Sequence, residues 1–104
     1  MAKPERGEVW VVDLGYASKT RPGVVFSINY GDQDRAVVTL VTHTTSTRGS
    51  QFEIVIPKKF LDEGAFDAQN IVTVPNVKVF KKLGKLTVEE FDTIETAVRH
   101  WLGL

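Results

Sequence analysis

The sequence has no cysteine, no net charge and no long hydrophobic run, and each absence excludes a class of protein. Without cysteine, the 104-residue chain forms neither disulfides nor thiolate metal sites. Thirteen basic residues balance thirteen acidic ones, which argues against a protein that coats nucleic acid through a uniformly positive surface. No apolar stretch approaches the roughly 20 residues that span a bilayer. We therefore expect one cytoplasmic globular domain over residues 1–104, in which any contact with nucleic acid is local.

Short apolar segments separated by turn residues predict a chain rich in β-strands. The segments carry β-branched and aromatic residues and are bounded by glycine, proline, asparagine or aspartate, as strands commonly are. The expected strands cover residues 7–14, 22–28, 36–43, 52–56, 71–74 and 78–80. Residues 58–63 are expected to form one short helical turn before Gly64.

The C-terminal segment predicts a long amphipathic helix. Thr87 followed by Glu90 matches a capping box, and Gly103 is typical of a helix end. Apolar residues recur at helical spacing between these signals: Val88, Phe91, Ile94, Val98, Trp101 and Leu102. We expect this stripe to cover an otherwise open sheet. Short, closely spaced strands capped by one helix favour a mainly β fold with α, a small curved β-barrel whose closure removes exposed strand edges.

Two segments, residues 19–26 and 37–46, each join an apolar strand to polar groups that suit a phosphodiester. In the first, Pro22 fixes its own backbone angle and keeps Arg21 extended, so that a cation is held at the mouth of a strand. In the second, a β-branched run opens into hydroxyl groups around the imidazole of His43. If the two strands lie side by side, these groups converge without a set of metal ligands. We therefore expect no metal or other cofactor.

These residue types suit the cleavage of RNA without a metal. That reaction requires activation of the ribose 2′-hydroxyl, stabilisation of negative charge at phosphorus, and protonation of the departing 5′-oxygen. Arg21 suits the second task because its planar guanidinium offers paired donors to phosphate oxygens and stays charged. Histidine titrates in the range of a proton shuttle, which makes His43 a catalytic candidate. Four hydroxyls beside it can donate to phosphate or sugar: Thr42, Thr44, Thr45 and Ser46.

Each of these residues also has a plainer interpretation. An arginine before proline is commonly an exposed strand-edge residue, threonine is frequent in strands, and a histidine can simply stand at a strand end. Geometry adds a difficulty, because Thr42 and His43 are adjacent and point to opposite faces of a regular strand. The two side chains share a pocket only if the chain bends or bulges there.

Five segments together resemble the MazF/PemK family of ribonuclease toxins. The chain reads RGEVW at residues 6–10, KTRPGVV at 19–25 and VTLVTHTT at 38–45, in the order in which the family has its first three strands. Residues 64–72 and 82–86 fall where the family has its penultimate strands and the lead into its last helix. No single motif is diagnostic, but their order and spacing together are fairly specific and span nearly the whole chain.

The resemblance implies an SH3-like barrel with a C-terminal helix that works as a homodimer in a toxin–antitoxin pair. Members of the family cut single-stranded RNA, commonly messenger RNA, at short sequences and without a metal, through attack by the 2′-hydroxyl. Carried over by position, Arg21 becomes the catalytic arginine and Thr42 the catalytic hydroxyl, His43 and Thr44 line the RNA groove, and Lys19 contacts phosphate. The implied partner is a short MazE-like antitoxin whose acidic tail lies in that groove.

The chain departs from the better-known family pattern in two places. Residues 15–20 form a shorter first loop than many members have, and Thr73 and Pro75 stand where some members have an arginine and an aspartate. The general acid and base are therefore open, with His43 and Lys19 as the candidates, and the cut sequence is not predictable.

Two other function classes remain open for a barrel of this kind. CcdB-like toxins share the fold, bind DNA gyrase and cleave nothing, and a plain nucleic-acid-binding barrel is a third possibility. The combination of Arg21 with Thr42 favours the nuclease, because a gyrase binder does not need a cation and a hydroxyl in one groove. Lysines at 78, 81, 82 and 85 could help to receive an antitoxin or could form an ordinary solvated surface.

Overall fold

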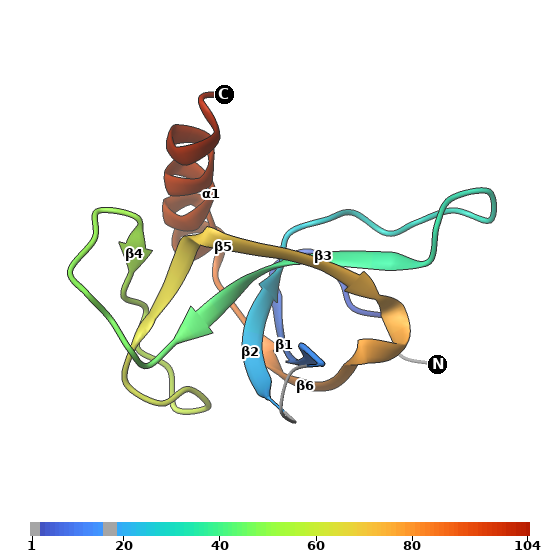
Figure 1. The fold of residues 1–104 in the computed structure, drawn as a ribbon, viewed down its shortest axis with the longest axis horizontal. Coiled ribbons are helices and arrows are strands. Elements are labelled where there is room, and N and C mark those ends of the chain that lie inside the picture. Colours follow the sequence, from blue (N-terminus) through green and yellow to red (C-terminus); the bar gives the residue numbers. More distant parts are fainter. Residues whose placement is uncertain (1–2, 16–18) are drawn as a thin grey trace.

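The computed structural model describes residues 3–15 and 19–104, which form six strands, one 3₁₀ turn and one α-helix (Figure 1). In chain order the elements are β1 (Glu8–Asp13), β2 (Thr20–Val25), β3 (Val37–Thr44), β4 (Glu53–Ile54), β5 (Ala65–Pro75), η1 (Asn76–Lys78), β6 (Val79–Lys85) and α1 (Val88–Leu102). Neighbouring strands pair antiparallel in the order β4-β5-β3-β2-β1-β6. In these two ranges no helix has the length and apolar character needed to cross a membrane.

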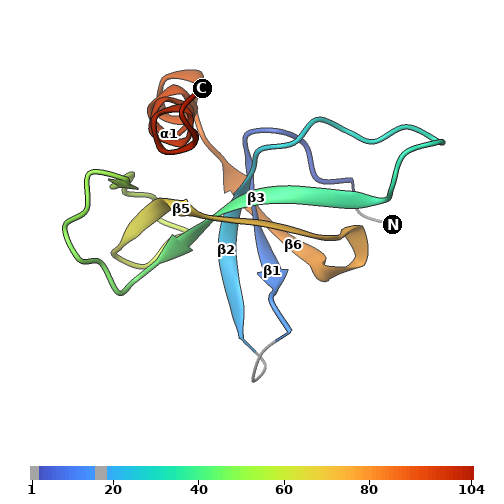
Figure 2. The same ribbon diagram turned by 45° about the horizontal axis from the view of Figure 1, so that its top comes forward.

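The sheet is strongly curled, and α1 lies on one side of it (Figure 1 and Figure 2). This arrangement confirms the predicted fold class, a small curved β structure with a C-terminal helix. The hydrogen-bonded ladder does not close completely: among the described residues, β4 and β6 each pair with one neighbour and form the two edges. β4 has only two residues and β6 carries three lysines, and short or charged edges resist pairing with other chains.

Two hydrophobic clusters lie on the two faces of the curled sheet, because side chains alternate along each strand. The cluster beneath α1 includes Val9, Val24, Val41, Phe66, Ile94 and Val98. The cluster on the other face consists of Trp10, Val12, Val25, Val38, Leu40 and Val79. Arg21 stands opposite Val12 in the ladder between β1 and β2. Val12 belongs to the second cluster, so Arg21 lies on the same face of the sheet as that cluster, at its edge.

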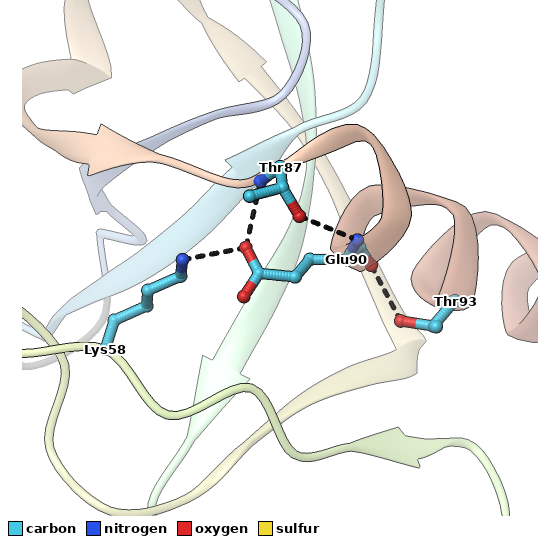
Figure 3. Close-up of polar contacts among 4 residues, drawn as sticks. All are labelled: Lys58, Thr87, Glu90 and Thr93. Atoms are coloured by element: carbon cyan, nitrogen blue, oxygen red, sulfur yellow. Dashed lines mark hydrogen bonds and ion pairs between the residues drawn. The ribbon is translucent and has the colours of Figure 1, made fainter.

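Helix α1 begins with the predicted capping box (Figure 3). The Thr87 hydroxyl accepts from the Glu90 backbone N–H at 3.1 Å, and the Glu90 carboxylate accepts from the Thr87 N–H at 2.9 Å. Lys58 Nζ lies 2.7 Å from the same carboxylate oxygen. The hydrogen bond from Lys58, together with the contacts to Thr87, holds the pKa of Glu90 below its ordinary value. At the other end, Gly103 adopts a left-handed conformation with φ of 73°, as the sequence predicts.

The apolar stripe of α1 is only partly buried, which corrects the sequence-based expectation. Phe91, Ile94 and Val98 are buried, but Trp101 is 46% exposed, and two further members, Val88 and Leu102, are exposed. The C-terminal end of α1 extends away from the sheet (Figure 1). Trp101 contacts the ring of Phe52 edge-on, with 5.4 Å between ring centroids.

Two strands are longer than predicted, and one predicted helical turn is wrong. β5 extends through residues 65–75 and β6 through 79–85. Hydrogen bonding to neighbouring strands keeps their polar stretches extended, although these stretches lack the apolar pattern of a strand. Residues 58–63 contain a tight turn closed by the Leu61 N–H and the Lys58 carbonyl, without a helix. Phe60 and Leu61 pack against the cluster beneath α1, and this tertiary packing overrides the local helical preference.

Candidate functional site

Arg21, near the start of β2, lines two polar clefts. We call the first the β5 cleft; it has a volume of about 400 Å³ and is lined by Arg21, Thr44, Ser46, Arg48, Ser50, Glu53, Asp67, Gln69 and Asn70. The second, the His43 cleft, measures about 280 Å³ and is lined by Lys19, Thr20, Arg21, Pro22, His43, Thr45 and Asp62. Arg21 is half-buried, and its guanidinium forms no ion pair or hydrogen bond with any described residue.

Six of the seven site residues named from the sequence line these clefts. Thr44 and Ser46 share the β5 cleft with Arg21. The His43 cleft holds Lys19, His43 and Thr45 beside the same arginine. β2 and β3 pair side by side, which meets the condition that the sequence analysis set for this convergence.

Thr42 lines neither cleft. Its side chain is fully buried, it stands opposite Gly23 in the ladder, and its hydroxyl donates to the Asn70 carbonyl at 3.2 Å. Thr42 and His43 thus obey the two-residue alternation of a strand and contact different surroundings.

The irregularity at this point lies in β5. Between the Val41–Ile71 and His43–Phe66 pairs, β3 advances by two residues while β5 advances by five. The extra residues of β5 include Gln69 and Asn70 in the wall of the β5 cleft. A bulge of this kind redirects side chains and ends regular pairing, which here makes room for the cleft.

His43 is almost completely buried, with 3% of its surface exposed, at the inner end of its cleft. Its ring meets Phe66 edge-on, with 5.0 Å between centroids. A Cβ at Gly64 would lie 2.9 Å from His43 Cε1 and 2.1 Å from the Thr44 carbonyl oxygen, so only glycine fits beside the imidazole. Burial lowers the pKa of His43 below its ordinary value, and the nearby Asp62 carboxylate opposes this shift. The lowered pKa favours the neutral form of the imidazole at pH 7, which is the form that can accept a proton.

Several cleft residues escaped the sequence analysis. Asp62 faces His43, while Glu53 and Asp67 bring carboxylates into the β5 cleft. Asp62 lies in a turn region, Glu53 lies in a strand of two residues, and Asp67 lies in a polar part of β5 that lacks the alternating apolar pattern of a strand. No spacing in the sequence therefore placed these residues near Arg21. In the described ranges, no group of three or more histidine or acidic side chains is arranged to hold a metal ion.

The predicted basic stretch is partly neutralised by β1. Lys82 Nζ lies 2.8 Å from Glu8, and Lys78 Nζ lies 3.7 Å from Asp13. Burial raises the pKa of the Glu8 carboxyl, but hydrogen bonds from Lys82, Trp10 and the backbone outweigh it and hold the pKa below its ordinary value. Two of the four lysines therefore pair within the fold.

Thr73 and Pro75, which stand where some family members have an arginine and an aspartate, line neither cleft. The Thr73 hydroxyl lies 2.7 Å from that of Thr39, and Pro75 ends β5. The shortened first loop falls partly on residues 16–18, outside the described residues.

Comparison with known proteins agrees with this architecture along the chain. The family model described as a PemK-like, MazF-like toxin of type II toxin-antitoxin systems matches residues 5–102. Endoribonuclease MazF1 of Mycobacterium bovis and endoribonuclease MazF4 of Mycobacterium tuberculosis are each 32% identical over the whole chain and 97% of their own length.

Solved structures give the same result. A mycobacterial endoribonuclease in complex with its cognate antitoxin superposes with a TM-score of 0.81 at 30% identity, over 97% of this chain and 96% of that one. MazF of Deinococcus radiodurans shares the fold, with a TM-score of 0.84 at 14% identity over all of both chains. The match over residues 5–102 and the identity to full-length relatives show that this chain belongs to the PemK-like, MazF-like toxin family of type II toxin-antitoxin systems.

Proposed function

We propose that the chain is an endoribonuclease toxin that cuts single-stranded RNA at specific sequences, without a metal, through attack by the 2′-hydroxyl. The observation that carries this proposal is the guanidinium of Arg21, which has no described partner and borders two polar clefts. Its full-length relatives at 32% identity are named endoribonucleases, which supports the same activity. Messenger RNA is the substrate that the family resemblance favours.

Arg21 stabilises the charge that builds up on the scissile phosphate. A guanidinium donates paired hydrogen bonds to two phosphate oxygens and keeps its charge at any working pH. Fixed donors aimed at developing charge commonly make the largest contribution to catalysis. Around Arg21, Lys19, Thr44, Thr45 and Ser46 provide further donors for phosphate and sugar oxygens.

His43 is the proton acceptor for the 2′-hydroxyl in this proposal. Its depressed pKa keeps the imidazole neutral before the reaction, and Asp62 stabilises the imidazolium that forms when the proton arrives. Lys19, in the same cleft, is the alternative proton-transfer group.

Thr42 keeps the catalytic role that the family resemblance implies, with one added condition. Its hydroxyl is bonded to the Asn70 carbonyl in the free protein. Contact with a substrate therefore requires Thr42 to exchange that carbonyl for a phosphate or sugar oxygen.

The proposed assembly is a homodimer of a single toxin domain, residues 1–104, that acts in the cytoplasm and is neutralised by a cognate antitoxin. One solved relative is in complex with its cognate antitoxin, which supports this partner. An acidic antitoxin tail would pair with Lys19, Arg21 and Arg48, the cations that line the two clefts.

The gyrase-binding and plain nucleic-acid-binding alternatives are less well supported. Neither explains an arginine without a described partner beside a nearly buried histidine that has a depressed pKa.

The test is incubation of the purified protein with mixed-sequence RNA in EDTA. We expect fragments that end in a 2′,3′-cyclic phosphate and a 5′-hydroxyl, because the 2′-hydroxyl is the nucleophile. The matched control is the same RNA with 2′-fluoro riboses, which should remain intact. RNA that survives prolonged incubation at high protein concentration would rule the nuclease out.

A further inference from the structure

The β5 cleft contains two carboxylates, Glu53 and Asp67, although the proposed substrate is a polyanion. They stand directly opposite each other in the β4–β5 ladder, an arrangement of like charges that destabilises a sheet. Carboxylates beside RNA phosphates also oppose the electrostatic part of binding. Both effects indicate that these groups have a task other than phosphate binding.

Glu53 has a structural task. Its carboxylate oxygens accept from the backbone N–H of Arg48 at 3.1 Å and from that of Ser50 at 3.1 Å. This carboxylate fixes the loop that follows β3, and that loop forms one wall of the β5 cleft.

Asp67 keeps free acceptor capacity. One of its oxygens accepts from the Gln69 backbone N–H at 2.9 Å, and the side chain forms no other hydrogen bond or ion pair with a described residue. Asp67 is half-buried in the cleft that Arg21 borders. Its second oxygen is therefore an acceptor held near the proposed scissile phosphate.

The rest of the cleft suits the edge of a nucleobase. Donors and acceptors are mixed along its walls: Ser46, Arg48, Ser50, Gln69 and Asn70. Phosphate contacts need only donors, whereas base edges present both kinds of group. Single-stranded RNA exposes these edges because its bases are unstacked.

We propose that the β5 cleft binds one nucleobase next to the scissile phosphate and that Asp67 determines which base is accepted. A carboxylate has two oxygens side by side, and the Asp67 oxygen that accepts from the Gln69 N–H keeps a second lone pair, so the group matches a base with two adjacent N–H donors. Guanine has this pattern in N1–H and N2–H₂ on its Watson–Crick edge, so guanine is the base that the cleft selects. The inference rests on the proposed RNA substrate and identifies part of its recognised sequence.

The first experiment sequences the ends of cleaved mixed-sequence RNA for the wild type and for Asp67→Asn. We expect a guanine preference at one position beside the cut in the wild type, reduced roughly 5- to 150-fold in the variant, as for loss of one paired base contact. Cleavage at sequences with guanine at this position should fall, and cleavage at sequences with another base there should not fall by the same factor. The matched control is Asp92→Asn, which makes the same change at an exposed position on α1 and should keep the preference.

The second experiment separates this proposal from the nuclease activity. Random-sequence RNA with 2′-fluoro riboses is selected on immobilised wild type and Asp67→Asn, and the bound molecules are sequenced. A guanine position that depends on Asp67 supports the base pocket even if the protein cuts no RNA.

Two results would overturn the inference. The first is cleavage by the wild type with no guanine position that depends on Asp67 in either experiment; this would leave the nuclease standing. The second is a variant that cuts every sequence more slowly by the same factor and has an altered pH profile, which would make Asp67 a proton acceptor.

Discussion

At the residue scale, the proposed chemistry centres on the guanidinium of Arg21. Arg21 borders both clefts without a described partner, while Lys58, Lys78 and Lys82 all have carboxylate partners. A half-buried guanidinium without a described ion-pair partner can donate paired hydrogen bonds to a phosphate. The residues around it differ in role because the alternation of β3 sends their side chains to different surroundings.

Thr42 provides a test that separates catalysis from stability. Thr42→Val keeps the shape of the side chain and removes the hydroxyl that donates to the Asn70 carbonyl. Loss of one buried hydrogen bond should lower the free energy of unfolding by about 1 kcal/mol. If the hydroxyl also contacts the substrate, RNA cleavage should fall far more than this small loss explains. Cleavage at the wild-type rate would remove Thr42 from the catalytic residues.

His43 predicts a pH dependence of stability. Burial lowers the pKa of the folded-state imidazole below its unfolded value, so protonation favours the unfolded chain. The stabilisation is complete above about pH 6.5 and is lost as the pH falls toward the lower folded-state pKa. In urea unfolding, the free energy of unfolding of the wild type should therefore be lower at pH 5.5 than at pH 7.5. This difference should be smaller in His43→Gln.

The matched control for this measurement is His100→Gln, which removes an exposed histidine on α1. His100→Gln should lose as much unfolding free energy between pH 7.5 and pH 5.5 as the wild type does. An equal decrease in His43→Gln and in the wild type would contradict the assignment.

At the scale of elements, β5 contributes most to the shape of the site. It pairs with β3 and β4, and its extra residues opposite Thr42 supply a wall of the β5 cleft. Gly64, just before β5, is confined by the Thr44 carbonyl and the His43 ring. The start of this strand therefore positions groups in both clefts.

The capping box of α1 should make a measurable contribution to stability. Thr87→Ala removes the hydroxyl that accepts from the Glu90 N–H, and such a loss should lower the free energy of unfolding by about 1 kcal/mol. Urea unfolding measures this change. Glu90→Gln is the companion variant, because it weakens the pair with Lys58 while the side chain can still accept from the Thr87 N–H. An unchanged midpoint in Thr87→Ala would exclude a capping contribution.

Trp101 should matter less for folding than a buried ring. It is 46% exposed and packs edge-on against Phe52, so Trp101→Ala should lower the free energy of unfolding by about 1 kcal/mol. The comparison variant Phe66→Ala removes a fully buried ring and should lose about 3–5 kcal/mol. Unfolding is measured at two protein concentrations, because the stability of a homodimer depends on concentration. Equal losses in the two variants at both concentrations would show that Trp101 is buried in solution.

At the scale of the whole molecule, local patterns predicted the parts of the fold that local chemistry determines. The capping box at Thr87, the helix end at Gly103 and the β-branched run of β3 each act through near neighbours, and the structure has all three. The lengths of β5 and β6 depend on pairing partners far away in the chain. The burial of Trp101 depends on how far the sheet extends beneath α1. A pattern along the sequence contains little of that information.

The same division applies to the site. Arg21, His43 and the hydroxyls after β3 stood in short recognisable segments, so their convergence followed from placing two strands side by side. Asp62 and Asp67 reach the clefts through a turn and a bulge that no spacing rule anticipates. The family resemblance supplied the expected chemistry, and the structure adds the surroundings in which these groups act.

The most direct test of this account is the initial rate of RNA cleavage in EDTA by Arg21→Ala. Loss of the charge that stabilises the scissile phosphate should slow cleavage by about 10²–10³-fold or more. The unfolding free energy should change by less than about 0.5 kcal/mol, because the arginine has no described partner. The control variant Arg99→Ala, at an exposed position on α1, should cut at the wild-type rate. Arg21→Ala that folds normally and cuts as fast as the wild type would contradict the account.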